Sequence, residues 1–280
     1  MEKLEKFNPQ NWKDIDDILM QIKKPSKSAP ESVTNSFPEE IKNGIAFITY
    51  DYGIDGVSIE MSKYAMSLQN FVFKNTEPQI HFIGGDFYQQ ADTIIKPEWK
   101  RFKLTGSNGW GKWENAFWYN QLFNEEMPQN SKKSDNLAKE IWKQAVSLSK
   151  RLGRYLAENN IHLLTPVNIC SNPGNLALGL CIPLVTELMD LYVLNSNHDY
   201  YWEGGKPETE KKPDEMPGPR DHFFRNYENH DFFRFFEKLY PWNGTKWIQT
   251  NINKLQSDKL IEKYNFDPAK VYELATSISN

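Results

Sequence analysis

The chain has few cysteines, no excess of basic residues and no long apolar run. Its 280 residues contain only two cysteines, Cys170 and Cys181, and neither their number nor their spacing is typical of a disulfide framework or a zinc site. We therefore expect both to be buried apolar side chains, and we predict no metal site. A formal net charge of −4 provides no overall field that would attract nucleic acid, so a nucleic-acid partner is not expected.

No segment approaches the roughly 18 uninterrupted apolar residues of a transmembrane helix, and the polar N-terminus lacks the apolar core of a signal peptide. We expect a cytoplasmic protein with at most peripheral membrane contact. Such contact would use a basic stripe on one face of an expected helix, formed by Lys139, Lys143, Lys150 and Arg154. The stripe can equally be a solvated helix face.

Two phosphate-binding motifs are also missing. The sequence contains neither the dinucleotide fingerprint G-x-G-x-x-G nor the Walker A pattern, which disfavours NAD-dependent and P-loop enzymes. A composition that is 39% hydrophobic and includes nine Trp is ample for a globular core.

Strand-like and helix-like segments alternate along most of the chain. Residues 1–43 read as an N-terminal helix on a linker, an appendage to one domain that covers residues 44–280. In that domain we expect strands at 44–50, 79–83, 161–166, 183–187, 246–250 and 271–274, and helices at 59–68, at 135–159 with Asp135 as N-cap, between 166 and 183, and at 253–264. Residues 86–123 read as an aromatic-rich insertion, and 204–219 as a mobile loop. The alternation predicts an α/β fold, a Rossmann-like, doubly wound and mostly parallel sheet.

The first candidate site is the turn after the first expected strand. Gly53, Gly56 and Val57 lie there, just before a helix. Glycines allow a ligand to approach the backbone, and a helix N-terminus attracts anionic or polar groups. A purely structural turn explains the same residues.

The second candidate site is the segment from Asn195 to Gly205, which we expect to follow the strand at 183–187 and to lie at the carboxyl edge of the sheet. It contains His198, Asp199, Tyr201, Trp202 and Glu203. Aromatic faces and polar groups together are what a carbohydrate site requires. His198 beside Asp199 is the candidate catalytic pair.

Three further residues are candidate ligand contacts. Asn168 and Glu187 lie at the ends of expected strands, although Asn168 can also cap a helix. Arg220 lies in the element Gly218-Pro-Arg-Asp-His-Phe-Phe224, where it either binds an anionic acceptor or forms an ion pair that anchors the preceding loop.

Taken in their order along the chain, the expected strands and the candidate-site segments described above resemble the N-terminal domain of retaining GT-B glycosyltransferases of the family 4 type. The resemblance covers about residues 44–280, and its specific part is the string Asn197-His198-Asp199-Tyr200-Tyr201-Trp202-Glu203. The terminal unit, residues 247–280, is similar to the family's crossing segment, except that Ala275-Thr276-Ser277 replaces the usual Pro-Asn-Gly.

The resemblance implies that this domain binds the acceptor and that a second domain binds the nucleotide sugar. The loop of Gly53 to Val57 would face acceptor and donor phosphates, and His198 and Asp199 would lie beside the transferred sugar. His198 would position groups rather than abstract a proton. No residues remain here for the donor domain, so we expect a separately encoded donor-binding partner, no tightly bound cofactor, and a nucleotide sugar as donor substrate only in that pairing.

Two alternatives remain open at this stage. The chain can be a carbohydrate-binding or regulatory module that has lost transfer activity. It can also be an unrelated nucleotide-binding α/β enzyme, which the missing phosphate motifs disfavour.

Overall fold

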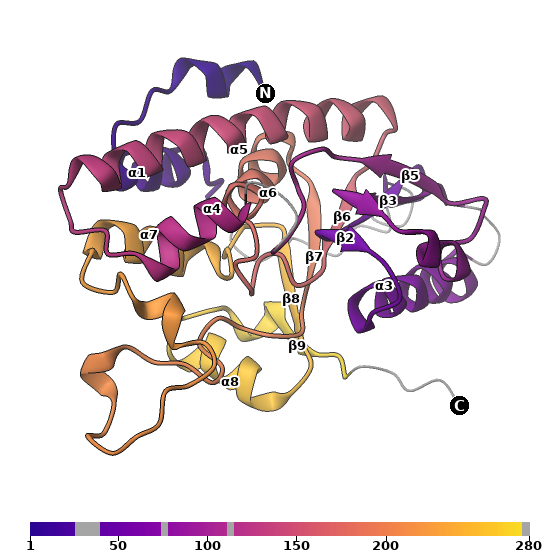
Figure 1. Cartoon of the computed structure of the whole chain (residues 1–280). Helices are drawn as coiled ribbons and strands as arrows, with labels where there is room; N and C mark the ends of the chain where they lie inside the picture. Colours follow the sequence, from indigo (N-terminus) through magenta and orange to yellow (C-terminus); the bar gives the residue numbers. More distant parts are fainter. Residues whose placement is uncertain (26–39, 74–77, 111–114, 276–280) are drawn as a thin grey trace.

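The computed structural model describes residues 1–25, 40–73, 78–110 and 115–275 (Figure 1). Within these residues seven strands form one parallel sheet in the order β5-β3-β1-β6-β7-β8-β9, and β2 and β4 form a separate parallel pair. The strands are β1 (Ile45–Ile48), β2 (Asp51–Tyr52), β3 (Ile80–Gly84), β4 (Asp86–Phe87), β5 (Lys100–Lys103), β6 (Leu163–Pro166), β7 (Tyr192–Asn197), β8 (Trp247–Asn251) and β9 (Val271–Glu273). The predicted α/β fold with a doubly wound parallel sheet is confirmed.

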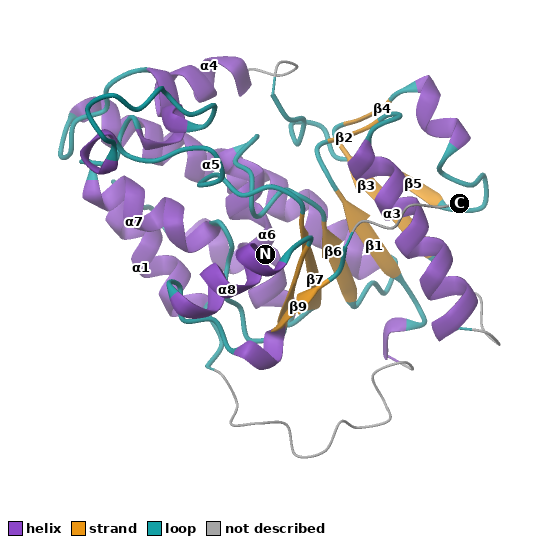
Figure 2. Cartoon of the chain, turned by 90° about the horizontal axis from the view of Figure 1, so that it is seen from below, coloured by secondary structure: helices purple, strands orange, loops and turns teal. Residues whose placement is uncertain are grey.

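Helices cover both faces of the sheet (Figure 2). The α-helices are α1 (Trp12–Ile22), α3 (Gly56–Ser67), α4 (Asn115–Tyr119), α5 (Lys132–Glu158), α6 (Leu176–Met189), α7 (His230–Leu239) and α8 (Lys254–Glu262). Short helical turns occur at Glu2–Lys6, Leu68–Val72, Gln89–Thr93, Asn120–Asn124, Glu208–Glu210, Asp221–Phe224 and Pro268–Lys270.

Strand β1 shows why the sheet is buried on both sides. Successive side chains of a strand point to opposite faces. Ile45 and Phe47 belong to one core cluster with Met61 and Ala65 of α3, whereas Ala46 and Ile48 belong to a second, larger cluster built on helices α1, α5, α6, α7 and α8. A continuous apolar run is therefore needed here, as in other parallel sheets.

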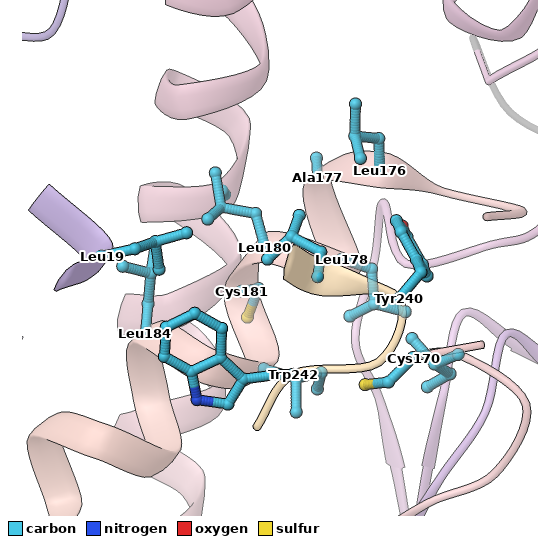
Figure 3. Packing of buried hydrophobic residues seen from close by; sticks show 14 of the residues in the cluster. Leu19, Cys170, Leu176, Ala177, Leu178, Leu180, Cys181, Leu184, Tyr240 and Trp242 are labelled. Carbon is cyan, nitrogen blue, oxygen red and sulfur yellow. The ribbon is translucent and has the colours of Figure 1, made fainter. Parts of the chain in front are cut away.

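The larger core centres on α6 (Figure 3). Figure 3 shows Leu19 of α1, several α6 side chains, Tyr240 and Trp242 gathered around this helix. Gly179 makes the packing possible, because a Cβ at that position would lie 2.1 Å from the Tyr240 hydroxyl. Cys170 and Cys181 are buried in the same cluster as free cysteines, as predicted.

Two predicted boundaries are wrong. Residues 183–187 form no strand, because they continue helix α6 through Pro183. Helix α5 begins at Lys132 with Ser131 as its N-cap, whose side chain accepts from the Ser134 N–H, so Asp135 lies in the first turn and is not the cap.

The N-terminal helix is part of the main body rather than an appendage. Trp12, Ile15 and Leu19 of α1 are buried against α5, α6 and α7, and the Trp12 indole donates to Ser134 Oγ at 3.0 Å. Most of the expected linker lies outside the described residues.

The stretch from Gly204 to Pro219, expected to be a mobile loop, contains one short helical turn and is tied at its base. Asp221 accepts hydrogen bonds from the N–H groups of Lys206 at 3.0 Å and Gly218 at 2.6 Å, and its carboxylate also pairs with Lys211 at 2.8 Å. This carboxylate and the 3.2 Å hydrogen bond from the Arg220 N–H to the Gly204 carbonyl together close the loop.

Within the described residues, no helix is long and apolar enough to cross a membrane. In the basic stripe of α5, Lys150 is used in an ion pair with Glu5, while Lys139, Lys143 and Arg154 are exposed.

Candidate functional site at the carboxyl edge of the sheet

The strand order changes direction between β1 and β6. From β1 the chain proceeds outward through β3 and β5 on one side, and returns through β6, β7, β8 and β9 on the other. Ligands of open parallel sheets bind outside the carboxyl ends of the strands at such a switch point. The loops that follow β1, β6 and β7 meet here, and they contain most of the candidate residues.

His198 directly follows β7 and lies in an acidic surrounding. Its Nε2 atom is buried and has no hydrogen-bond partner among the described residues. Burial lowers the pKa of His198, while the carboxylates of Glu60, Asp199 and Asp55 act in the opposite direction. Asp55 and Glu60 come from the start of α3, so the structure brings the first and second candidate sites together.

Asp199 is joined to the neighbouring strand end by Asn168. The Asp199 N–H donates to Asn168 Oδ1 at 3.1 Å, and Asn168 Nδ2 donates to Asp199 Oδ2 at 3.4 Å. Asn168 has φ +60°, a left-handed conformation that asparagine tolerates better than most residues. It therefore holds the β6 and β7 loops together, and it does not act as a helix N-cap, since Asn175 caps α6.

Arg220 anchors the segment after β7. Its guanidinium pairs with Asp199 at 3.2 Å and Glu203 at 3.7 Å, and it donates to the carbonyl of Tyr200. The side chain is 22% exposed. These contacts correspond to the anchoring role that the sequence left open for Arg220.

Glu203 is engaged with the protein itself. Its carboxylate accepts from the Tyr200 N–H at 2.8 Å and from Gln256 Nε2 at 2.9 and 3.1 Å, and Gln256 also donates to the carbonyl of His198 at 3.0 Å. Helix α8 thus fixes the backbone on which His198 stands, and Glu203 acts as a positioning residue.

Below these residues, buried amides join strands β7 and β8. Asn195 and Asn197 both donate to Gln249 Oε1, at 2.7 and 3.2 Å, and Asn251 accepts from Asn197 at 3.2 Å and from the Tyr200 hydroxyl at 2.7 Å. Asn195 Oδ1 has no partner among the described residues, and the bonds that are formed fix one arrangement of the strand ends.

Three candidate contact residues have buried side chains. Tyr201 is 1% exposed and packs against Phe233 and Phe236 of α7. Trp202 is 8% exposed and stacks on Tyr200 and on Tyr264, with ring centroids at 4.1 and 5.1 Å. Glu187, expected at a strand end, lies in α6, where it accepts from Trp242 Nε1 at 2.8 Å and from the Lys24 N–H at 3.0 Å. The expected ligand contacts of these three residues stay a prediction, and the contacts that their side chains make in the structure are internal.

The glycine turn is open, but its helix N-terminus already has a carboxylate. A Cβ at Gly56 would meet nothing within 4 Å, whereas Gly53 donates from its N–H to Ser58 Oγ at 3.3 Å. Asp55 caps α3 by accepting from the Ser58 N–H at 2.9 Å and from Ser58 Oγ at 2.8 Å. A negative charge at this end of the helix disfavours a phosphate beside Val57.

Two contributors to this edge were not foreseen from the sequence. Glu60 is only 3% exposed, and Tyr64, whose pKa burial raises to about 12, approaches Ser196 of β7 at 3.5 Å between the hydroxyl oxygens. Glu60 and Tyr64 are four residues apart on α3 and therefore share one face of that helix.

Nearby, Asn108 bridges two carboxylates from its Nδ2 atom, Asp51 at 2.7 Å and Asp86 at 3.0 Å. No cluster of three or more metal-ligating side chains occurs among the described residues.

Comparison with known proteins adds the following. No protein-family model matches the chain. No curated protein matches it either. Among solved structures, it is similar to a glycosyltransferase of Rickettsia africae, with 11% identity and a TM-score of 0.40 over 83% of this chain and 42% of that one. It is also similar to a putative UDP-N-acetylglucosamine 2-epimerase of Listeria monocytogenes, with 10% identity and a TM-score of 0.42 over 82% of this chain and 44% of that one. The chain thus spans less than half the length of either protein.

Proposed function

We propose that this chain is the acceptor-binding half of a retaining, sugar-nucleotide-dependent glycosyltransferase, and that the acceptor lies at the carboxyl edge of the sheet beside His198. The observation that carries the proposal is the unpartnered Nε2 atom of His198, which follows β7 beside the β1/β6 switch point and feels the charges of Glu60, Asp199 and Asp55.

The acidic surrounding suits a polyhydroxylated acceptor. Carboxylates accept hydrogen bonds from sugar hydroxyls, and a neutral imidazole offers either an acceptor or a donor nitrogen. Asp55 and Asp199 retain solvent exposure, whereas Glu60 lies deeper. In this arrangement His198 orients an acceptor hydroxyl and stabilises it, and the Asp199 carboxylate, held by Arg220 and Asn168, supplies a negative charge that favours the protonated imidazole.

The same charges disfavour the donor. A nucleotide sugar carries a diphosphate, and the capping carboxylate of Asp55 occupies the helix end where a phosphate would otherwise bind. Donor phosphates would then be bound by a second domain, supplied by a longer polypeptide or by a separate chain. The nucleotide sugar is a substrate of that pairing and not a cofactor of this domain.

A carbohydrate-binding module without transfer activity is the second candidate. The contacts of Arg220 favour it, because this cation of the site is already paired with Asp199 and Glu203 and is not free for an anionic group. The two candidates share a glycan site and differ in catalysis.

The test has two steps. The chain is first titrated with a glycan panel, with His198→Ala as the variant and His162→Ala as the control, since His162 is exposed on the turn before β6 at the opposite edge. A donor-domain protein recovered by pull-down is then added with UDP- and GDP-linked sugars. Glycan binding that His198→Ala weakens, followed by transfer, supports the enzyme. Glycan binding without transfer supports the module, and tight sugar-nucleotide binding by the chain alone contradicts the half-enzyme assignment.

A further inference from the structure

One tryptophan differs from the others because about half of its side chain is in contact with solvent. Trp110, in the loop after β5, has an exposed fraction of 49%. Six other tryptophans are at most 8% exposed: Trp12, Trp99, Trp142, Trp202, Trp242 and Trp247. An indole is among the largest apolar surfaces that a side chain offers, and its burial stabilises a fold. The exposure of Trp110 therefore calls for a reason other than packing.

The Trp110 side chain is held in its exposed position. Its Nε1 atom donates to the carbonyl of Pro173 at 3.3 Å, and the Tyr119 ring lies at 72° to it with the ring centroids 6.3 Å apart. Among the described residues, no ring is stacked on Trp110. The hydrogen bond uses the N–H edge of the indole, so it ties the ring to the protein while much of the ring stays accessible.

The loop that contains Trp110 is also fixed. Asn175 Nδ2 donates to the carbonyls of Gly106 and Asn108, each at 3.0 Å. A Cβ at Gly109 would lie 2.9 Å from side-chain atoms of Tyr50, so glycine is what allows the loop to pack against that ring. A ring that is already ordered loses little conformational entropy when a ligand binds to it.

Trp110 lies at the point where the strand order changes direction. Strands β1 and β6 are neighbours there. The indole is bonded to Pro173 in the loop after β6. The preceding residue, Gly109, donates from its N–H to Asp51 Oδ2 at 3.4 Å, just beyond the end of β1. Ligands of open parallel sheets bind at this position, outside the carboxyl ends of the strands.

Asp51 supplies hydrogen-bond acceptors beside the ring. Its carboxylate accepts from Asn108 Nδ2 at 2.7 Å and from the Gly109 N–H. A carboxylate has about four acceptor positions, so the half-buried Asp51 retains capacity for the hydroxyls of a ligand. A sugar presents C–H groups on its ring faces and hydroxyls at its rim, and an apolar ring next to acceptors matches both.

We propose that Trp110 is the stacking platform of a second sugar subsite, and that the acceptor is therefore an oligosaccharide that runs along the carboxyl edge from His198 to Trp110. The inference rests on the proposed function, because it takes a glycan acceptor beside His198 as its premise. It adds the substrate class, which is a chain of sugars in place of a single sugar.

The loop after β6 connects the two ends of this path. Asn168 in that loop accepts from the Asp199 N–H, next to His198. Five residues later Pro173 accepts from Trp110, so the Cα atoms of Asn168 and Pro173 are at most about 18 Å apart. Strand β6 separates β7 from β1, and two strand spacings amount to about 10 Å. A single pyranose is too small to bridge such a span, whereas a short oligosaccharide covers it.

A protein surface is the alternative occupant of this ring. Phe117 of the neighbouring helix α4 is also exposed, at 59%, and exposed aromatic side chains occur at protein interfaces. The sugar is favoured because Trp110 is bonded at the switch point of the sheet and lies beside the carboxylate of Asp51, whereas Phe117 has neither feature.

Calorimetric titration with glucose, mannose and N-acetylglucosamine oligomers, from the monomer to the tetramer, tests the proposal. In at least one series we expect the affinity to rise with length. Trp110→Ala should weaken binding of the tetramer about tenfold, as expected for the loss of one stacking contact, and leave binding of the monomer unchanged. Trp110→Phe retains a ring and should have a smaller effect. Phe71→Ala removes a ring that is 73% exposed after α3, and it should have no effect.

The outcomes separate this inference from the proposed function, and unfolding curves establish that each variant is folded. If His198→Ala weakens binding of the tetramer and Trp110→Ala does not, the second subsite is overturned and the proposed function stands. If no member of any series binds, the proposed function is contradicted, and the inference with it.

Two further results would overturn the inference alone. If Trp110→Ala weakens binding of the monomer as much as that of the tetramer, the acceptor needs only one sugar and the oligosaccharide class is wrong. If Trp110→Ala abolishes recovery of the donor-domain protein by pull-down and leaves glycan affinity unaltered, the exposed ring belongs to a protein interface.

Discussion

The backbone N–H of Asp199 donates a 3.1 Å hydrogen bond to Oδ1 of Asn168, and this bond joins the loops that follow β6 and β7. Asn168 also accepts from Ser171 Oγ at 3.0 Å. The Asn168 side chain thus fixes the position of the loop that contains His198 relative to the other loops at the carboxyl edge of the sheet.

Replacing Asn168 tests this joint. Asn168→Ala removes the hydrogen bonds and leaves a Cβ at φ +60°, so we expect the free energy of unfolding to fall by about 2 to 3 kcal/mol. Asn168→Gly relieves the backbone strain and should lose roughly 1 kcal/mol less. Denaturant titration measures both. A glycine variant as unstable as the alanine variant would mean that the left-handed backbone contributes nothing.

Arg220 should be a stabilising anchor. Arg220→Met keeps much of the side-chain volume but removes the contacts to Asp199, Glu203 and the Tyr200 carbonyl, and we expect a loss of about 1 to 2 kcal/mol. Arg225→Met is the matched control, because Arg225 pairs with Glu126 where both side chains are more than half exposed, and such pairs contribute about 0 to 1 kcal/mol. Equal effects of the two substitutions in denaturant titrations would contradict the anchoring role.

Glu187 is expected to support the core and not a ligand. Glu187→Ala leaves the Trp242 indole and the Lys24 N–H without their acceptor in a buried place, which should destabilise the fold by about 2 to 4 kcal/mol. Glu187→Gln keeps an acceptor oxygen and should be milder. Thermal unfolding separates the two, and an alanine variant of unaltered stability would show that these bonds are dispensable.

His81 should make stability depend on pH. Its side chain is fully buried on β3, with Nδ1 2.8 Å from the Tyr155 hydroxyl, and burial together with the nearby Lys100 lowers its pKa from 6.5 to about 4. Between these values the unfolded chain binds the extra proton and the folded chain does not. The contribution of neutral His81 to the free energy of unfolding is therefore complete above pH 6.5. It is lost as the pH falls toward 4, by about 3 kcal/mol in all.

His81→Gln retains a polar partner for Tyr155 and removes the titration. We expect its stability to change less between pH 7 and pH 4.5 than that of the unaltered chain, whereas exposed His162→Gln should reproduce the original slope. If the free energy of unfolding changed equally with pH in all three proteins, the assignment of the pH dependence to His81 would be contradicted.

The elements that could be predicted are those with an unambiguous pattern. Strands β1, β3 and β6 are short apolar runs, and α5 has one apolar stripe. Helix α6 was predicted as a helix followed by a strand at 183–187. The reasons are that it is buried on all sides and so shows no polar face, and that Pro183 suggested a break. Strand β5, Lys-Arg-Phe-Lys, was missed because an edge strand can be polar. Helix α7 was missed although Phe232, Phe235, Phe236 and Leu239 have helical spacing.

The site was predicted at the level of its segment and not of its side chains. The sequence predicted that His198 and Asp199 follow a strand at 183–187, which is helix in the structure; the strand that precedes them is β7, which was not predicted. Periodicity is undefined in such a loop, so it could not show that Tyr201 and Trp202 turn into the core while His198 does not. Nor could it show that Asp55 would be used as a cap, or that Glu60 and Tyr64 would reach the edge from α3.

The most direct test of the glycan site is residue-specific NMR of the histidine rings during titration with the glycan panel. We predict that at least one glycan shifts the imidazole signals of His198 in a saturable way, while those of His162, at the opposite edge, do not move. If a glycan binds and the His198 signals stay in place, or if no glycan in the panel shifts them, the assignment of the acceptor site to the carboxyl edge beside His198 is contradicted.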